Sequence, residues 1–180
     1  MRVIAGEFRS RRLKSIPGLA TRPTPDRLRE TLFDILTRRI EGAVFLDAYA
    51  GTGAVGIEAL SRGARHCYFL EKNRLALEAI RENVASLGLE ARATVVTGPV
   101  LLMLSRHAAD IIFADPPYEL EREYRALVDL LAEIRPGLGI IQHSARQALP
   151  ELQGGLERTR LVKQGDNALS FYAAPPVSDT

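Results

Sequence analysis

The sequence contains a single cysteine, and no stretch of it holds 18 or more consecutive apolar residues. One cysteine cannot form an internal disulfide, and Cys67 lies in the apolar run CYFL, which is typical of a buried strand thiol. A chain without a long apolar run has no transmembrane helix, and the first residues also lack the apolar segment of a secretory signal. These absences predict a cytoplasmic protein without a membrane partner.

The composition supports one compact unit with an uneven charge. The 180 residues, 46% of them hydrophobic, are enough for a single domain with a sizeable core. Residues 1–40 hold ten Arg or Lys against four Asp or Glu (+6), and residues 41–180 hold 14 against 18 (−4). Arginine makes up 21 of the 24 basic residues, which suits phosphate contacts and equally follows from a GC-rich genome. Composition alone therefore does not identify a nucleic acid partner.

From residue 43 onward, short β-branched or aromatic runs alternate with helical patterns, which predicts a parallel sheet flanked by helices. The last two runs are separated only by QGDN and should form an antiparallel hairpin. The expected strands lie near 43–47, 66–71, 92–96, 110–114, 138–142, 157–163 and 168–173. The expected helices lie near 54–62, 73–87, 99–106 and 121–133, with a short helical turn near 145–149. We therefore predict an α/β fold, a doubly wound and mostly parallel sheet of seven strands with an antiparallel closing hairpin.

Residues 1–40 have a different pattern and should form a small appendage rather than a second domain. Two short extended pieces flank Gly6, and a helix should run from about 26 to 38, with Thr24 or Asp26 as its cap and Pro25 near its first turn. Its apolar positions should pack on the main sheet; they are Leu28, Leu32, Phe33, Ile35 and Leu36. The expected organisation is an appendage at 1–40, a main domain at 41–175 and a tail at 176–180.

A glycine-rich loop follows the first strand of the predicted sheet. Its sequence, DAYAGTGAVG at residues 47–56, leads from an apolar strand directly into a helix and satisfies the dinucleotide fingerprint G-x-G-x-x-G. Glu71 follows at the end of the next strand, where an acid reaches a ribose. A dinucleotide would place its pyrophosphate on the helix N-terminus, whereas S-adenosylmethionine needs an anchor for its ammonium group, and Asp47 fits this second need. The loop predicts an adenosine cofactor and leaves a nicotinamide oxidoreductase open as an alternative.

The tetrapeptide DPPY, residues 115–118, ends the fourth predicted strand and favours methyl transfer to an exocyclic amine of a nucleobase. The carboxyl ends of the strands face the ligand crevice, so these residues should lie beside the glycine-rich loop. Such an amine is flat and weakly nucleophilic, and Asp115 and the carbonyl group of Pro116 can accept its two N–H groups. Pro117 stiffens the turn, and Tyr118 can stack on a base turned out of its helix. This chemistry requires no metal ion, and the tetrapeptide has no role in a nicotinamide enzyme.

These motifs resemble those of a known family, the bacterial small-subunit ribosomal RNA guanine-N2 methyltransferases of the RsmD type, over nearly the whole chain. Besides the two motifs above, the resemblance rests on RVIAG at 2–6, TRPT at 21–24 with Asp26, and IEALSRGA at 57–64. It implies a Rossmann-like class I fold, S-adenosylmethionine as the cofactor, and guanine N2 of 16S ribosomal RNA, within small-subunit particles, as the target. We also expect a monomer.

The resemblance assigns residues to three roles. TRPT is expected to fold over the cofactor, and the basic N-terminus is expected to meet RNA, although a solvated hairpin has the same sequence pattern. The residues expected at the cofactor are Arg22, Thr24, Asp47, Tyr49, Gly51, Thr52, Gly53 and Glu71. Those expected to contact RNA phosphates are Arg9, Arg11, Arg12 and Lys14. The expected catalytic residues are Asp115, Pro116, Pro117 and Tyr118.

Two positions depart from the family pattern. Relatives usually place an acid after the third strand to hold the adenine amine, where this chain has TGPV at 97–100, and Pro99 cannot make that bond. Gln142 replaces a common glutamate on the fifth strand, and His143 beside it is a candidate general base, although a lone histidine there is more often structural. The departures leave open a non-catalytic RNA-binding assembly factor. The similar geometry of the purine amines leaves open methylation of adenine N6 in DNA or RNA.

Overall fold

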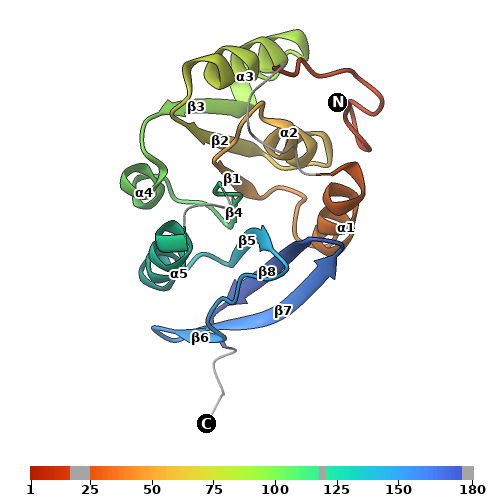
Figure 1. The fold of residues 1–180 in the computed structure, drawn as a ribbon. Helices are drawn as coiled ribbons and strands as arrows, with labels where there is room; N and C mark the ends of the chain where they lie inside the picture. The colour runs from red at the N-terminus through yellow and green to blue at the C-terminus, as the bar shows by residue number, and fades with distance from the viewer. Residues whose placement is uncertain (17–24, 118–120, 176–180) are drawn as a thin grey trace.

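The computed structural model describes residues 1–16, 25–117 and 121–175, so Arg22, Thr24 and Tyr118 of the predicted site lie outside the described residues. Eight strands form one sheet in the order β3-β2-β1-β4-β5-β8-β7-β6 (Figure 1). The strands are β1 Val44–Ala48, β2 His66–Glu71, β3 Ala93–Thr97, β4 Ile111–Ala114, β5 Leu138–Ser144, β6 Leu152–Gln153, β7 Leu156–Gln164 and β8 Asn167–Ala173. The α-helices are α1 Asp26–Leu36, α2 Ala54–Ser61, α3 Arg74–Ser86, α4 Val100–Met103 and α5 Glu121–Ile134. Neighbouring strands from β1 to β5 are parallel, and β8, β7 and β6 continue the sheet in antiparallel pairs.

The predicted α/β fold with its closing hairpin is confirmed, with one strand more than expected. The additional strand, β6, pairs with β7 across Gly154 and Gly155, whose φ angles are +54° and +80°. Consecutive residues with positive φ favour glycine, and a Gly-Gly pair between two strands is a hairpin signal that the sequence does contain. The helical turn expected near 145–149 is wrong, because Leu149 precedes Pro150, which disfavours helical backbone at Leu149.

Helix α1 begins at Asp26 as predicted, but it ends at Leu36 rather than near residue 38, and Asp26 does not cap it. Pro25 occupies the position before the first turn without a capping side chain, and the Asp26 carboxylate pairs with Arg29 at 3.2 Å instead of capping the helix. Four of the five predicted apolar positions are buried and Ile35 is partly buried, while Arg29 is buried although it was not predicted; the four are Leu28, Leu32, Phe33 and Leu36. The Phe33 ring lies 6.2 Å from the ring of Phe45 in β1, so α1 packs directly on the sheet.

Helices cover both faces of the sheet (Figure 1). On one face α1, α2 and α3 share an apolar cluster with Phe45, and on the other α4 and α5 share a second cluster with Leu46. These two adjacent residues of β1 enter opposite clusters because side chains alternate along a strand. Val3 and Leu13, from the N-terminal segment, belong to the first cluster. Among the described residues, no helix combines the length and apolar character needed to cross a membrane.

A buried carboxylate fixes the N-terminal segment to α2. Glu58 accepts hydrogen bonds from the backbone N–H groups of Ile4 (2.8 Å) and Ala5 (3.0 Å), and from Nε of Arg62 (2.8 Å). A fully buried carboxylate needs such donors, because burial removes its water. A Cβ atom at Gly6 would stand 1.9 Å from the carbonyl oxygen of Ser61, so the N-terminal segment and α2 touch through their backbones. The motifs RVIAG and IEALSRGA, which are distant in sequence, therefore form a single contact.

Candidate active site

Three carboxylates converge at the carboxyl edge of the sheet. Asp47 lies in β1, Glu71 is the last residue of β2, and Asp115 directly follows β4. The register pairs Asp47 with residues of β2 and β4, and the backbone N–H of Asp115 donates to the carbonyl oxygen of Ala48 at 3.2 Å. The structure therefore places the start of the DPPY tetrapeptide beside the glycine-rich loop, as the sequence predicts.

The charge at this edge distinguishes between the two cofactor classes. Asp47 is buried, and its Oδ2 accepts a hydrogen bond from the backbone N–H of Gly56 at 2.8 Å. Burial raises the pKa of Asp47 well above its usual value, and the charges of Asp115 and Glu71 raise it further. A negative edge attracts a cation and repels the two phosphates of a dinucleotide. The arrangement suits the sulfonium and ammonium groups of S-adenosylmethionine and argues against the nicotinamide alternative.

Glu71 shapes the glycine-rich loop through its carboxylate. Oε2 accepts the backbone N–H of Gly51 at 2.9 Å, and Oε1 accepts those of Lys72 and Asn73, each at 2.8 Å. Gly51 has a φ of +57° and Gly53, at the start of α2, a φ of +80°, which glycine adopts without strain. Because each carboxylate oxygen can accept two hydrogen bonds, Oε2 retains an acceptor position for a ribose hydroxyl.

Asn83 links the N-terminal segment to the same loop. Its Oδ1 accepts the backbone N–H of Lys14 at 2.7 Å, and its Nδ2 donates to the carbonyl oxygens of Lys14 (3.2 Å) and Thr52 (3.0 Å). Asn83 is buried in α3, and these three bonds satisfy a side chain that would otherwise be costly to bury. Asn83 therefore bridges the backbone of Lys14 in the N-terminal segment and the backbone of Thr52 in the glycine-rich loop.

Helix α5 holds the backbone of the tetrapeptide. The buried hydroxyl of Tyr124 donates to the carbonyl oxygen of Pro116 at 3.2 Å. Pro116 is buried, Asp115 is half-buried and Pro117 is exposed, so the turn connects the interior with the surface. A carbonyl oxygen has two lone pairs, so the bond from Tyr124 occupies only one of them. The role of this carbonyl was predictable from the tetrapeptide, whereas the sequence gives no signal that Tyr124 orients it.

Two side chains with reactive groups are structural in this fold. Nδ1 of His143 lies 2.8 Å from the carbonyl oxygen of Ser144, and Nε2 lies 2.8 Å from Oγ of Ser170. Since a carbonyl only accepts, we assign the ring proton to Nδ1, and Nε2 then accepts from Ser170. Burial lowers the pKa of His143, which keeps the ring neutral with both nitrogens in use. Cys67 is buried as expected, and burial raises the pKa of its thiol well above its usual value.

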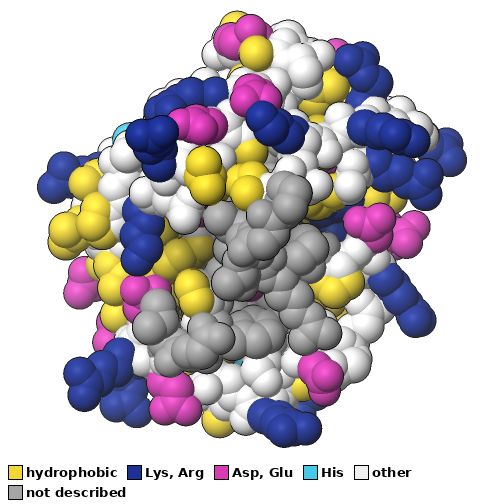
Figure 2. All heavy atoms as spheres, turned by 45° about the horizontal axis from the view of Figure 1, so that its top comes forward, with side chains coloured by type: hydrophobic (Ala, Val, Ile, Leu, Met, Phe, Trp, Pro, Cys, Tyr) yellow, Lys and Arg dark blue, Asp and Glu magenta, His cyan; other side chains and the backbone are white. Residues whose placement is uncertain are grey.

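The four predicted phosphate contacts differ in how free their side chains are. Nζ of Lys14 pairs with Glu82 at 2.5 Å, and Nη2 of Arg11 donates to the carbonyl oxygen of Ser86 at 3.1 Å. Arg9 and Arg12 are exposed, and within the described part of the chain their side chains have no ion-pair or hydrogen-bond partner. Figure 2 shows Lys and Arg side chains spread around the rim of one face, with acidic side chains between them. Arg9 and Arg12 are thus the freest of the four to bind a phosphate.

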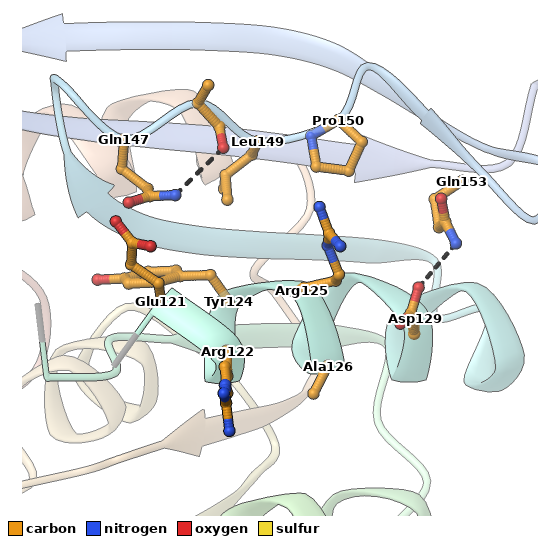
Figure 3. Close-up of a pocket in the computed structure, with 11 residues that line it drawn as sticks. Glu121, Arg122, Tyr124, Arg125, Ala126, Asp129, Gln147, Leu149, Pro150 and Gln153 are labelled. Atoms are coloured by element: carbon orange, nitrogen blue, oxygen red, sulfur yellow. Dashed lines mark hydrogen bonds between the residues drawn. The ribbon is translucent and has the colours of Figure 1, made fainter. Parts of the chain in front are cut away.

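A groove of about 970 Å³ runs between α5 and residues 147–153 (Figure 3). Tyr124, whose hydroxyl holds Pro116, lines one end of the groove. At the other end Asp129 accepts a hydrogen bond from Nε2 of Gln153 at 2.7 Å. The groove therefore adjoins the predicted site, while Asp47, Glu71 and Asp115 lie outside its lining.

The fold and the site together define a class I S-adenosylmethionine-dependent methyltransferase. The chain belongs to the family described as Conserved hypothetical protein 95, whose sequence profile matches residues 1–173. This family includes the RsmD-type methyltransferases, so the resemblance drawn from the sequence motifs is confirmed.

Three relatives illustrate the similarity. The chain is 38% identical over 177 residues to Ribosomal RNA small subunit methyltransferase D of Escherichia coli (strain K12), a match that covers 96% of this chain and 89% of that protein. The solved structure of yhhF from Escherichia coli has a TM-score of 0.82 at 32% identity and covers 97% of this chain and 99% of its own. A hypothetical protein from Thermus thermophilus, TTHA0928, has a TM-score of 0.79 at 31% identity, with 97% and 99% coverage.

Proposed function

We propose that this protein transfers the methyl group of S-adenosylmethionine to the exocyclic N2 amine of a guanine in small-subunit ribosomal RNA. The observation that carries the proposal is the Asp115-Pro116-Pro117 turn, whose Asp115 carboxylate and Pro116 carbonyl stand beside the glycine-rich loop. The relatives named as ribosomal RNA small subunit methyltransferases supply the substrate class. A ribosomal RNA substrate would place the protein in the cytoplasm.

In the proposed reaction the amine nitrogen attacks the methyl carbon, the carbon–sulfur bond breaks and S-adenosylhomocysteine leaves. The nitrogen is a poor nucleophile because its lone pair is delocalised into the ring. Asp115 and the carbonyl oxygen of Pro116 accept hydrogen bonds from its two N–H groups. These bonds favour a pyramidal nitrogen and stabilise the positive charge that develops there. The methylated amine then loses a proton to water. Asp47 supplies negative charge for the ammonium group of the cofactor, and Glu71 accepts a hydrogen bond from a hydroxyl group of its ribose.

The remaining expected contacts belong to the same proposal. Arg9 and Arg12 would bind phosphates of the RNA, with smaller contributions from Arg11 and Lys14, which already have partners. Tyr118 would stack on the target base, and the tetrapeptide TRPT, with Arg22 and Thr24, would cover the cofactor. We propose that the enzyme acts as a monomer on small-subunit particles.

Transfer of labelled methyl from S-adenosylmethionine to undermethylated small ribosomal subunits, followed by nucleoside analysis, tests the proposal. We expect N2-methylguanosine. N6-methyladenosine would instead support the adenine alternative, which the tetrapeptide also fits. Salt-sensitive RNA binding without any transfer would favour the assembly-factor alternative.

Replacing Tyr124 by phenylalanine should lower kcat about fivefold, because one neutral hydrogen bond contributes about 1 kcal/mol and the Pro116 carbonyl loses its fixed direction. Tyr172→Phe is the matched control, since its buried hydroxyl also donates to a proline carbonyl, that of Pro150, at 2.7 Å. Steady-state kinetics should show a lower kcat only for Tyr124→Phe, with the KM for S-adenosylmethionine within about twofold in both. Equal losses in the two variants would show that the effect is one of general stability.

A further inference from the structure

Four buried side-chain polar atoms in the described ranges have no hydrogen bond: two belong to the guanidinium group of Arg29, and the other two come from different elements. These other two are the hydroxyl oxygen of Tyr49, in the glycine-rich loop, and Oε2 of Glu123, in the first turn of α5. Leaving such an atom unsatisfied destabilises the fold, and native proteins contain few of them. Burial raises the pKa of the Tyr49 hydroxyl, and the Glu123 carboxylate raises that pKa further. The two groups are therefore neighbours, although their geometry falls short of a full hydrogen bond. The pair presents an acceptor beside a group that can donate.

The backbone around Tyr49 holds its side chain in this position. Tyr49 has a φ of +62°, a conformation that is unfavourable for a bulky residue and that persists only where surrounding contacts impose it. Its ring packs against the same apolar cluster as Val100 of α4 and Tyr124 of α5. The unsatisfied atoms therefore lie where the glycine-rich loop meets the face formed by α4 and α5.

The loop after β3 has no acidic residue for the adenine amine, and two of its backbone positions cannot donate to the base. An adenosine whose ribose is bound by Glu71 at the end of β2 extends its base toward β3 and the start of α4. The backbone N–H of Gly98 already donates to the carbonyl oxygen of Glu71 at 3.1 Å, and Pro99 has no N–H. Helix α5, which carries Glu123 in its first turn, packs against α4, the helix that follows this loop.

We propose that Glu123 and Tyr49 recognise the Watson–Crick edge of the adenine in S-adenosylmethionine. The exocyclic amine donates to Oε2 of Glu123, and the hydroxyl of Tyr49 donates to the ring nitrogen N1. The inference rests on the proposed function, because it takes S-adenosylmethionine as the cofactor. The amino-acid end of the cofactor also carries a donor and an acceptor, but the proposed function assigns its cationic ammonium group to Asp47, which lies near the carboxylate of Asp115.

The experiment compares binding of S-adenosylhomocysteine and S-inosylhomocysteine by isothermal titration calorimetry. In the inosine compound an oxygen replaces the amine and N1 carries a proton, so both hydrogen-bonding positions are reversed. We expect the wild-type protein to prefer S-adenosylhomocysteine by about 100-fold, since two buried polar groups are left mispaired by the other ligand. Glu123→Gln should weaken S-adenosylhomocysteine about tenfold and strengthen S-inosylhomocysteine, because an amide can donate to its oxygen.

Two further variants complete the test. Tyr49→Phe should weaken S-adenosylhomocysteine about fivefold while the ring packing is kept. Glu121→Gln, an exposed residue of the same helical turn, is the matched control and should change neither affinity by more than about twofold. Thermal unfolding establishes that each variant is folded.

The outcomes separate this inference from the proposed function. A wild-type protein that binds no S-adenosylhomocysteine contradicts the proposed function itself. Normal binding that Glu123→Gln leaves unchanged, or weakens equally for both ligands, overturns only the assignment of Glu123. Unchanged affinity of Glu123→Gln for 5′-methylthioadenosine, which keeps the adenine and lacks the amino-acid end, would likewise overturn it in favour of an amino-acid contact.

Discussion

Replacing Asp115 by alanine is expected to lower the rate of methyl transfer by about 10³-fold while the protein remains folded and binds its cofactor. The reason is that the variant loses the charged acceptor that stabilises the developing charge on the amine, an effect worth several kcal/mol in preorganised sites. The fold should tolerate the change because the charge of Asp115 is one of those that raise the pKa of buried Asp47. Removing it relieves repulsion between two carboxylates at the same edge.

Single-turnover transfer of labelled methyl measures this effect, and calorimetric titration with S-adenosylhomocysteine measures the affinity. Asp34→Ala is a suitable control, since its carboxylate is 70% exposed on α1 and lies outside the site. We expect it to retain full activity. Transfer by Asp115→Ala at the wild-type rate would refute the assigned mechanism, whatever the substrate proves to be.

Gly6→Ala should destabilise the protein by about 3 kcal/mol, which is a large part of the stability of a domain of this size. Gly6 has a φ of +82°, and an added Cβ would stand 1.9 Å from the carbonyl oxygen of Ser61, which is backbone and cannot turn away. The positive φ alone costs about 1–2 kcal/mol for alanine. The remainder comes from moving the segment away from α2, which strains the hydrogen bonds of Ile4 and Ala5 to Glu58.

Gly42→Ala isolates the conformational part of this cost. Gly42 has a φ of +70°, and no atom lies within 4 Å of a Cβ built there, so we expect a loss of only about 1 kcal/mol. Urea unfolding of the two variants provides the comparison, and Gly6→Ala should also melt about 6–12 °C below the wild type. Equal losses for the two glycines would mean that the contact between Gly6 and Ser61 contributes nothing beyond backbone conformation.

The strand ends were predictable from sequence because the information is local. Asp47, Glu71 and Asp115 each follow an apolar run, and parallel strands deliver their carboxyl ends to one edge. Glu58 and Asn83 were not predictable in the same way, since each bonds backbone groups more than 30 residues away and backbone groups have no side-chain signature. In sequence both are polar positions of a helix, the kind normally assigned to a solvated face.

Tyr124 and β6 were missed for different reasons. The helical pattern of α5 accounts for a buried aromatic at position 124, and only the three-dimensional structure shows that its hydroxyl reaches Pro116. Strand β6 has two residues, too few for a periodic pattern, although its glycine turn was visible in the sequence. The predicted roles of Arg22, Thr24 and Tyr118 stay predictions, since these residues lie outside the described ranges.

The burial of Val3 and Leu13 determines which kind of experiment can probe RNA binding by the N-terminal segment. Both side chains belong to the core cluster shared with α1 and β1, so a truncated protein lacking residues 1–14 would expose that cluster as well as lose its arginines. Poor RNA binding by such a deletion would be uninterpretable. Charge reversal at Arg9 and Arg12, whose side chains are exposed, leaves the core intact and changes only the charge offered to RNA.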